Sequence, residues 1–308
     1  MKPYLSVVIP VYNESGNIQK LCDRLLTTLD KLGKPYEIIF TNDGSKDNSE
    51  AELEAVYKQH PDKIRVVQFK RNFGQHMAII AGFEITTGDV IVTLDADLQN
   101  PPEEIPNLLA KIEEGYDLVS GVRQKRQDNW FRTYVSKFVN HIRALITNIR
   151  MTDHGCMLRA YSRNVIDLIN ATDEASIYIP ALAYTYATNP TEIPVKHEAR
   201  HEGKSKYRLY DLARLYFDIM TGYSTLPLQV FTMFGFAVSF LSILFVIYLF
   251  IRRLIIGPEA EGLFTLFAIL FFLIGVLLMG LGIVGEYIGR IYKEVRRRPR
   301  FVIKKILK

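Results

Sequence analysis

The stretch Val90-Ile-Val-Thr-Leu-Asp-Ala-Asp-Leu-Gln99 decides the fold. Its first five residues are apolar or β-branched, which predicts a buried strand, and two aspartates follow where that strand ends. Side chains alternate along a strand, so Asp95, Asp97 and Gln99 would share one side if the extended conformation continues. Oxygen ligands suit a hard cation such as Mg²⁺ or Mn²⁺, although an isolated Asp-x-Asp pair is commonly a solvated loop.

Similar apolar runs precede this strand. Segments 5–11, 36–41 and 64–70 predict strands, and they alternate with helical patterns at 18–32, 48–58 and 75–86. Alternation of this kind predicts an α/β domain with a mostly parallel sheet, whose ligands bind at the carboxyl ends of the strands. The loops expected at those ends are 10–14, 42–45, 71–76 and 95–99.

The C-terminal part has a different composition. Segments 229–251 and 263–285 contain no Asp, Glu, Lys, Arg or His, and each exceeds the roughly 20 residues that a helix needs to cross a bilayer. We therefore expect four regions: a cytoplasmic catalytic domain (1–206), an interfacial amphipathic helix (207–228), two transmembrane helices joined by a short periplasmic loop (229–285), and a basic cytoplasmic tail (286–308). A helix packed on the domain is the alternative for 207–228.

Charge favours membrane lipids as a partner. The net charge of +5 resides largely in the tail, which predicts attraction to anionic lipid headgroups and no role in binding nucleic acid. Other basic side chains could bind phosphates, although isolated ones are usually solvated. They are Arg123, Arg132, Lys137, Arg159, Arg200, Lys204 and Lys206.

Several short motifs match by residue spacing, but the surrounding sequence lacks the features that each motif needs. The sequence His197-Glu-Ala-Arg-His201 has zinc-protease spacing, but Pro194 and Gly203 bracket it too tightly for the helix that such a site needs. No complete phosphate loop and no Gly-x-Gly-x-x-Gly occurs. Zinc proteases, P-loop NTPases and dinucleotide oxidoreductases are therefore not supported.

Four motifs together resemble a known family. They are Val7-Val-Ile-Pro-Val-Tyr-Asn-Glu14, Asn42-Asp-Gly-Ser45, Asp95-Ala-Asp-Leu-Gln99 and Arg200-His-Glu-Gly-Lys-Ser-Lys-Tyr207. They are similar to family 2 glycosyltransferases with a GT-A fold, in the branch that attaches sugars to dolichyl or undecaprenyl phosphate. The bacterial members of that branch also carry two trailing membrane spans, and the likeness covers almost the whole chain.

The resemblance implies an activity. It is the inverting transfer of a sugar from a UDP-sugar donor to undecaprenyl phosphate at a bacterial inner membrane. Further segments, including 71–76, 122–132 and 155–161, resemble members that transfer 4-deoxy-4-formamido-L-arabinose, a step in lipid A modification and polymyxin resistance. Glucose, mannose or N-acetylgalactosamine are alternative sugars. A processive polysaccharide synthase would need more spans, and a sugar-nucleotide sensor or scaffold would need no intact metal ligands.

The resemblance also implies roles for individual residues. Asp95, Asp97 and Gln99 would surround Mg²⁺ or Mn²⁺, with Asp97 counted as catalytic. Asp153 would act as an acid/base or orienting group. The remaining assignments are Arg123 and Lys137 at the lipid phosphate, Pro10, Tyr12, Glu14 and Asp43 at the donor, and Arg200, Ser205 and Lys206 in a closing loop.

Two of these residues also have simpler interpretations, and one position departs from the family. Asp43 lies in a segment typical of a chain reversal, and Glu14 could simply begin a helix. The family usually has Asp where this chain has Asn42, which puts a base or ribose contact in doubt.

Glycines in the second span bear on assembly. Gly275, Gly282, Gly285 and Gly289 are spaced to share one helical face and would allow close helix packing. They predict a homo-oligomer packed through this span, and the resemblance implies a homotetramer. The alternative is that they contact only the first span of the same chain.

Overall fold

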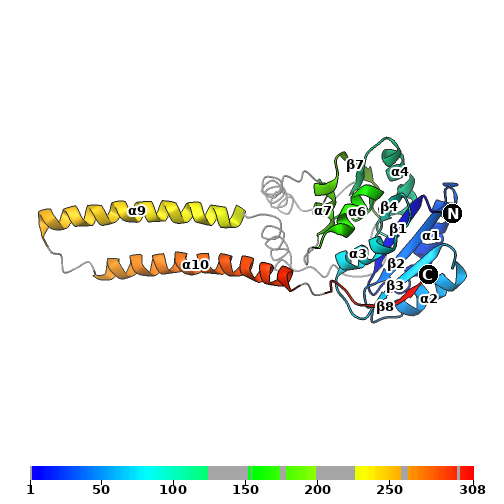
Figure 1. Cartoon of the computed structure of the whole chain (residues 1–308), viewed down its shortest axis with the longest axis horizontal. Helices are drawn as coiled ribbons and strands as arrows, with labels where there is room; N and C mark the ends of the chain where they lie inside the picture. Colours follow the sequence, from blue (N-terminus) through cyan, green and yellow to red (C-terminus); the bar gives the residue numbers. More distant parts are fainter. Residues whose placement is uncertain are drawn as a thin grey trace. The chain divides into compact units, whose positions relative to one another are not determined.

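The computed structural model describes residues 2–123, 152–153, 155–173, 178–198, 226–257, 263–296 and 299–308. The chain forms two compact units. One contains the described residues up to 198 together with the last ten residues, and the other contains two long helices (Figure 1).

The first unit alternates strands and helices along the chain. Its elements are β1 (Leu5–Val11), α1 (Ile18–Asp30), β2 (Tyr36–Asn42), α2 (Ser49–Gln59), β3 (Ile64–Phe69), α3 (Gln75–Ile85), β4 (Val90–Thr93), the short 3₁₀ helix η1 (Pro102–Glu104), α4 (Ile105–Glu113), β5 (Leu118–Arg123), β6 (Arg159–Ser162), α6 (Arg163–Ala171), α7 (Ile179–Tyr186), β7 (Pro190–Val195) and β8 (Ile303–Leu307). Every strand and helix expected before residue 95 is present within a few residues of its predicted bounds.

The strands form one sheet in the order β7-β5-β6-β4-β1-β2-β3-β8. Strands β4, β1, β2 and β3 are parallel neighbours, with Leu5 opposite Tyr36 and Val8 opposite Thr93. Strands β6 and β8 run antiparallel to their neighbours. The expected α/β fold with a mostly parallel sheet is therefore confirmed, and the carboxyl ends of β1, β2 and β4 lie at the same edge.

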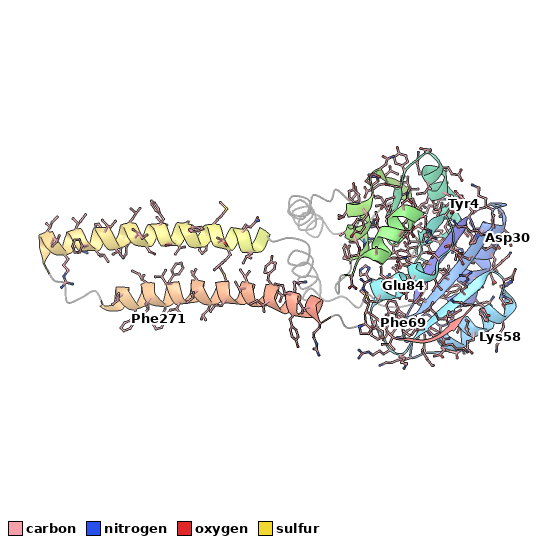
Figure 2. The ribbon with its side chains drawn as sticks, viewed as in Figure 1. Tyr4, Asp30, Lys58, Phe69, Glu84 and Phe271 are labelled. Carbon is pink, nitrogen blue, oxygen red and sulfur yellow. The ribbon has the colours of Figure 1, made fainter. Side chains whose placement is uncertain are left out.

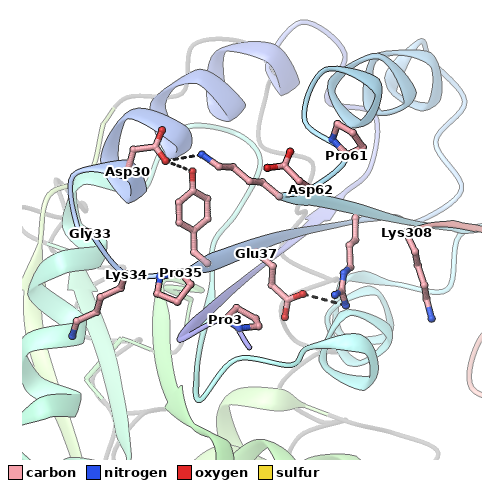
Figure 3. Close-up of a pocket in the computed structure, with 12 residues that line it drawn as sticks. Pro3, Asp30, Gly33, Lys34, Pro35, Glu37, Pro61, Asp62 and Lys308 are labelled. Atoms are coloured by element: carbon pink, nitrogen blue, oxygen red, sulfur yellow. Dashed lines mark hydrogen bonds and ion pairs between the residues drawn. The ribbon is translucent and has the colours of Figure 1, made fainter. Parts of the chain in front are cut away.

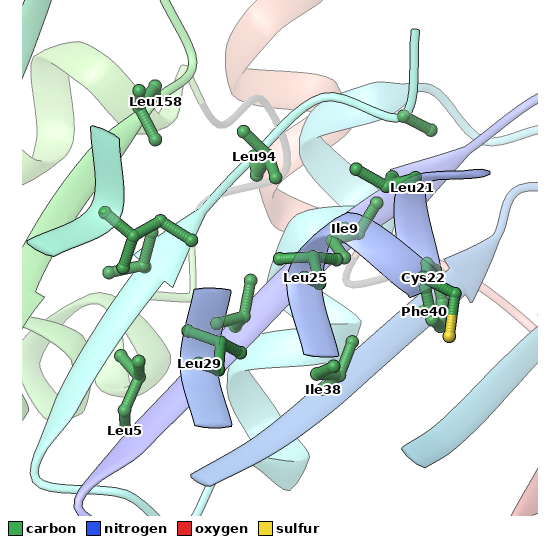
Figure 4. Packing of buried hydrophobic residues seen from close by; sticks show 14 of the residues in the cluster. Leu5, Ile9, Leu21, Cys22, Leu25, Leu29, Ile38, Phe40, Leu94 and Leu158 are labelled. Atoms are coloured by element: carbon green, nitrogen blue, oxygen red, sulfur yellow. The ribbon is translucent and has the colours of Figure 1, made fainter. Parts of the chain in front are cut away.

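Helices cover both faces of this sheet because its strands are apolar on both sides. On β1 and β2, Leu5, Val7, Ile9, Ile38 and Phe40 pack against buried residues of α1, α2 and α4 (Figure 4). The intervening Val8 and Ile39 pack against α3, α6 and α7. The period-two alternation of a strand thus sends successive side chains into two separate cores.

The last strand comes from the C-terminus. Strand β8 pairs antiparallel with β3, and the ring of Phe301 stacks on Phe69 with centroids 5.0 Å apart. Lys304 and Lys305 form ion pairs with Glu50 and Glu54 of α2. A separate basic tail was expected over 286–308, but the second long helix continues to Val295 and residues 303–307 pair with the edge strand β3. These two lysines therefore pair within the protein.

The second unit contains α9 (Leu226–Ile256) and α10 (Leu263–Val295). Both are long and apolar enough to cross a membrane, and their large apolar side chains, such as Phe271, are exposed (Figure 2). A Cβ on Gly280 would lie 2.4 Å from the ring of Phe231, so α10 approaches α9 closely there. The predicted pair of spans is thus present as two helices. The predicted interfacial helix at 207–228 lies almost entirely outside the described residues.

Candidate active site

The loops after β1 and β2 are joined by hydrogen bonds. The backbone N–H of Asn13 donates to Ser45 Oγ (3.0 Å), and the side-chain oxygen of Asn13 accepts from the N–H of Lys46 (2.8 Å). The N–H of Glu14 donates to Ser49 Oγ (3.0 Å). Asn13 has a φ of 56°, a left-handed conformation that asparagine tolerates better than most residues. The two loops therefore form one surface at the carboxyl edge of the sheet.

Three residues that were predicted to bind the sugar-nucleotide donor lie on this surface. Pro10 is the penultimate residue of β1 and is partly accessible, and Tyr12 is 39% exposed. The carboxylate of Glu14 accepts from Asn17 Nδ2 (2.8 Å), one residue before α1 begins. Glu14 thus helps to organise the start of α1 while remaining half-buried at the edge where a ligand would bind.

Asn42 has a local structural role. It is 2% exposed, and its side-chain oxygen accepts from the N–H of Ser45 (3.0 Å), which closes the turn. Aspartate and asparagine both supply such an acceptor. The departure from the family pattern at this position therefore preserves the hydrogen bond that shapes the turn.

Asp43 is buried and bonded to the next loop. It is 2% exposed, and its carboxylate accepts from Asn72 Nδ2 (2.8 Å) and from the N–H groups of Phe73 (2.7 Å) and Gly74 (2.9 Å). Burial raises the pKa of Asp43, and the two backbone N–H groups oppose that rise. Three bonds leave little of the carboxylate's hydrogen-bonding capacity for a nucleobase, so the predicted contact with the base has a structural competitor.

The loop after β4 presents the predicted metal ligands on its accessible side. Asp95, Asp97 and Gln99 are partly exposed, whereas the intervening residues 94, 96, 98 and 100 are buried. The alternation matches the sequence prediction, but its cause differs. Strand β4 ends at Thr93, and the chain then turns instead of continuing extended.

The conformation of Leu98 accounts for the alternation of buried and partly exposed residues in this turn. Its φ is 62°, in the left-handed region that leucine rarely adopts, and its side chain is 4% exposed within the core beneath β1 and β4. The Asp97 carboxylate accepts from the N–H of Gln99 (3.2 Å) across the same turn. Burial of the leucine side chain offsets the backbone strain, so Asp97 and Gln99 are held on the accessible side.

The donor set of this loop fits a hard divalent cation. Two carboxylates and one amide carbonyl provide only oxygen ligands, as Mg²⁺ and Mn²⁺ prefer. Among the described residues, no group of three or more His, Cys, Asp or Glu side chains is arranged to enclose a metal ion. A cation here would therefore need further oxygens from water or from a diphosphate.

Arg123 and Asp153 form a partly buried ion pair near this loop. Arg123 Nε and Nη2 donate to the two oxygens of Asp153 at 2.7 and 2.8 Å. Burial acts to raise the pKa of Asp153, but the bonds and charge of Arg123 outweigh it and the pKa is lowered. The pKa of Arg123 is raised, first by its bonds to Asp153 and further by charges that include Asp95. The lowered pKa makes the Asp153 carboxylate a weak proton acceptor, and both of its oxygens already bind Arg123, which suits an orienting group.

Arg159 does not belong with the phosphate-binding cations. It is fully buried, and its guanidinium donates to the carbonyl oxygens of Cys156 (2.9 Å) and Asp153 (3.2 Å) and to Ser120 Oγ (3.2 Å). From the sequence, Arg159 was grouped with basic residues that could bind phosphates. In the structure it supports the backbone of the loop that carries Asp153.

The segment after β7 is tied to the Asp-x-Asp loop. The N–H of Glu198 donates to the carbonyl oxygen of Gln99 (2.8 Å). Arg24 of α1 bonds both oxygens of Glu103 (3.0 and 2.8 Å) and also bonds Glu198 (3.1 Å). The sequence did not reveal Arg24, because these partners lie 79 and 174 residues away. Residues 196–198 are not helical, and residues 199–201 of the His-Glu-x-x-His match lie outside the described residues.

Four predicted site residues, Lys137, Arg200, Ser205 and Lys206, lie outside the described residues. A pocket that is described lies elsewhere, at the amino ends of β2 and β3 (Figure 3). Two ion pairs lie in its lining, Lys63 with Asp30 (2.8 Å) and Arg65 with Glu37 (3.1 Å). In a parallel sheet ligands bind at the opposite ends of the strands, so this pocket is not the candidate active site.

The sheet, the position of the Asp-x-Asp loop and the paired helices define a class of protein. Residues 6–169 match the Glycosyl transferase family 2, and residues 226–291 match the GtrB C-terminal hairpin. The chain belongs to glycosyl transferase family 2, and it is a glycosyltransferase.

Two relatives are similar over nearly the whole chain. The undecaprenyl-phosphate 4-deoxy-4-formamido-L-arabinose transferase of Shewanella sediminis is 47% identical over 99% of this chain and 92% of its own length. The transferase of the same name from Edwardsiella ictaluri is 46% identical over 99% of this chain and 94% of its own.

A solved structure supports the fold alone. Glucosyl-3-phosphoglycerate synthase from Mycobacterium tuberculosis, in complex with Mg²⁺ and uridine-diphosphate, superposes with a TM-score of 0.51 at 18% identity. The match covers 71% of this chain and 77% of that one.

Proposed function

We propose that this protein transfers 4-deoxy-4-formamido-L-arabinose from UDP to undecaprenyl phosphate, with inversion at the anomeric carbon. The observation that carries the proposal is full-length similarity, at 47% identity, to a transferase of that name. The product would serve lipid A modification and polymyxin resistance.

A divalent cation would be held by Asp95, Asp97 and Gln99. Their oxygen ligands fit Mg²⁺ or Mn²⁺, and the glucosyl-3-phosphoglycerate synthase named above was crystallised with Mg²⁺ and uridine-diphosphate. When bound, the cation would neutralise charge on the departing UDP. Pro10, Tyr12, Glu14 and Asp43 would form the donor side of the site, and Arg200, Ser205 and Lys206 would close over the diphosphate.

The acceptor phosphate would meet Arg123 and Lys137. A phosphate ester is anionic near neutral pH, so it needs alignment and charge compensation more than deprotonation. Asp153 would orient Arg123, since both carboxylate oxygens bind that guanidinium. The two bonds to Arg123 and the lowered pKa of the Asp153 carboxyl favour this role over the acid/base alternative.

The catalytic unit would face the cytoplasm from a bacterial inner membrane, with α9 and α10 crossing it. Strand β8 follows α10 in the chain and pairs with β3, which precedes α9. Both ends of the helical hairpin therefore join the same unit, as two crossings require. The arginines and lysines that follow the second span favour the cytoplasmic side.

A homotetramer packed through α10 is the assembly that we propose. No described atom lies within 4 Å of a Cβ built on Gly275, Gly282, Gly285 or Gly289, whereas Gly280 is the position that approaches α9. This favours packing between copies over the alternative in which these four glycines contact the first span. Native mass spectrometry in mild detergent and in lipid nanodiscs should detect oligomers, and monomers alone in both would contradict the proposal.

The function is tested by giving the purified enzyme undecaprenyl phosphate and a panel of UDP-sugars. Mass spectrometry of the lipid product should detect 4-deoxy-4-formamido-L-arabinosyl phosphate as the favoured product. Preferential transfer of glucose, mannose or N-acetylgalactosamine would overturn the sugar assignment while leaving the reaction class intact.

The two sides of the site are tested separately. Arg123→Ala should impair use of undecaprenyl phosphate far more than UDP binding, and Asp43→Ala should do the reverse. Equal loss of UDP affinity in both variants would contradict the assignment.

A further inference from the structure

Gln75 connects the loop after β3 to the proposed metal site. It is the first residue of α3, and its Nε2 donates to Asp95 Oδ1 over 2.7 Å. The sequence placed Gln75 in a polar loop at the carboxyl edge but gave it no role. An amide donor on one carboxylate oxygen restricts rotation of that carboxylate, which fixes where its lone pairs point.

The position of Gln75 depends on the residues that precede it. Asp43 binds Asn72, Phe73 and Gly74, the three residues immediately before α3. Gly74 has φ and ψ of 100° and 153°, a conformation that only glycine adopts readily, and the helix begins at the next residue. Asp43 therefore determines where the first turn of α3 begins.

The backbone around Asp43 allows little movement. A Cβ on Gly44 would lie 2.4 Å from the carbonyl carbon of Arg71, so the turn after β2 and the loop after β3 are in direct backbone contact. Displacing the loop would leave the buried Asp43 carboxylate without its donors. Each unsatisfied buried polar group costs roughly 1–3 kcal/mol, and more when it is charged.

We propose that Gln75 is a positioning residue for the metal ligand Asp95 and that Asp43 holds it there. The relay Asp43–Gln75–Asp95 then links the donor side of the site to the metal side. This inference rests on the proposed function, because it takes Asp95 to be a metal ligand. Losing an outer hydrogen bond to a metal ligand typically weakens metal binding by about 10- to 100-fold.

An exposed Gln–Asp pair on α1 provides a matched control. Gln19 Nε2 donates to Asp23 Oδ1 over 2.9 Å, the same chemistry at a similar distance. Neither residue lies in a loop at the carboxyl edge of the sheet. Gln19→Ala therefore removes an equivalent bond that has no proposed role.

The test measures Mn²⁺ binding to the full-length protein in detergent with UDP present, by electron paramagnetic resonance. Gln75→Ala should raise the Kd for Mn²⁺ about 10-fold or more. Gln19→Ala should leave it unchanged, and the unfolding temperature of both variants should match that of the unaltered protein. Asp43→Asn should also raise the Kd, and the double variant Asp43→Asn/Gln75→Ala should be no worse than the more affected single variant, because the two residues act in series.

Two negative results are distinguishable. If the unaltered protein binds no Mn²⁺ with UDP present, the metal site fails and the relay fails with it. If the unaltered protein binds Mn²⁺ and Gln75→Ala binds it within twofold as tightly, the role of Gln75 is overturned while the proposed function stands. Fully additive losses in the double variant would overturn the link to Asp43.

Discussion

Two pairs of aspartates at the same sheet edge differ in what surrounds them. Asp43 and Asp153 are 2% and 7% exposed, and protein N–H groups or a guanidinium bind both oxygens of each. Asp95 and Asp97 are partly exposed and lie on the accessible side of a strained turn. The sequence and the family resemblance gave all four a role in the site: Asp43, Asp95 and Asp97 in binding ligands, and Asp153 as an acid/base or orienting group. Their surroundings divide them into a buried pair whose oxygens are bonded within the protein and a partly exposed pair that we propose as cation ligands.

The largest effect is expected at the accessible pair. Asp97→Asn removes one charge from the proposed ligand set without changing volume, and the amide oxygen can still accept from Gln99. UDP release should fall by roughly 10²- to 10³-fold, the scale seen when one electrostatic stabiliser is lost. The unfolding temperature should be unchanged. Full activity of this variant in the presence of EDTA would contradict the proposal that Asp97 is a metal ligand and Asp43 is not.

Substitution in the buried pair should lower the free energy of unfolding. Asp43→Asn leaves one carbonyl oxygen to serve three donors, so at least one buried N–H group loses its partner. The free energy of unfolding should fall by roughly 2–4 kcal/mol, measured by denaturant titration of the detergent-solubilised protein. Asp62→Asn, at an exposed aspartate, is the control. An unchanged stability would mean that Asp43 does not support the loop as described.

A smaller effect is expected at Asp153, the other buried carboxylate, when its neighbour Gly155 is substituted. A Cβ on Gly155 would lie 2.7 Å from Arg123 Nη2, so Gly155→Ala should push the guanidinium away from Asp153. Turnover at limiting undecaprenyl phosphate should fall about tenfold, within the range that a 1 Å misplacement produces, while UDP binding is retained. Gly235→Ala, in α9 where a Cβ meets no described atom, should have no effect. Loss of UDP binding in Gly155→Ala would place Arg123 on the donor side instead.

The smallest effect is expected at Arg24 of α1, which joins Glu103 of η1 to Glu198 in the segment after β7. Its side chain is 30% exposed, and partly exposed ion pairs contribute about 1 kcal/mol or less. Arg24→Met should therefore raise the KM for the UDP-sugar by up to about fivefold with little change in kcat. Lys111→Met, which breaks an exposed pair with Glu114, should leave KM unchanged. A loss confined to kcat would contradict a role in donor binding.

Much of the catalytic unit could be predicted because its signals are local. Apolar runs gave β1 to β4, and motif spacing identified 95, 97 and 99 as an accessible set. Asp43 could not be assigned its partners, because residues 72–74 come close only after the sheet has formed. Strand β8 was missed for another reason. Its partners shift from Gln68–Lys305 to Phe69–Ile303, so Lys304 is an extra residue that breaks the alternation a strand would show.

The origin of β8 has a consequence for biosynthesis. The ribosome makes residues 303–307 after both hydrophobic helices have been synthesised, so β3 remains an open sheet edge while the hairpin is being made. Unpaired edges recruit other strands and promote aggregation, and Phe69 would be uncovered until Phe301 arrives. The sheet of the catalytic unit can therefore gain β8 only after both helices of the membrane hairpin have been synthesised. A nascent chain that stops before residue 299 would carry a complete Asp-x-Asp loop on a sheet that lacks its final strand.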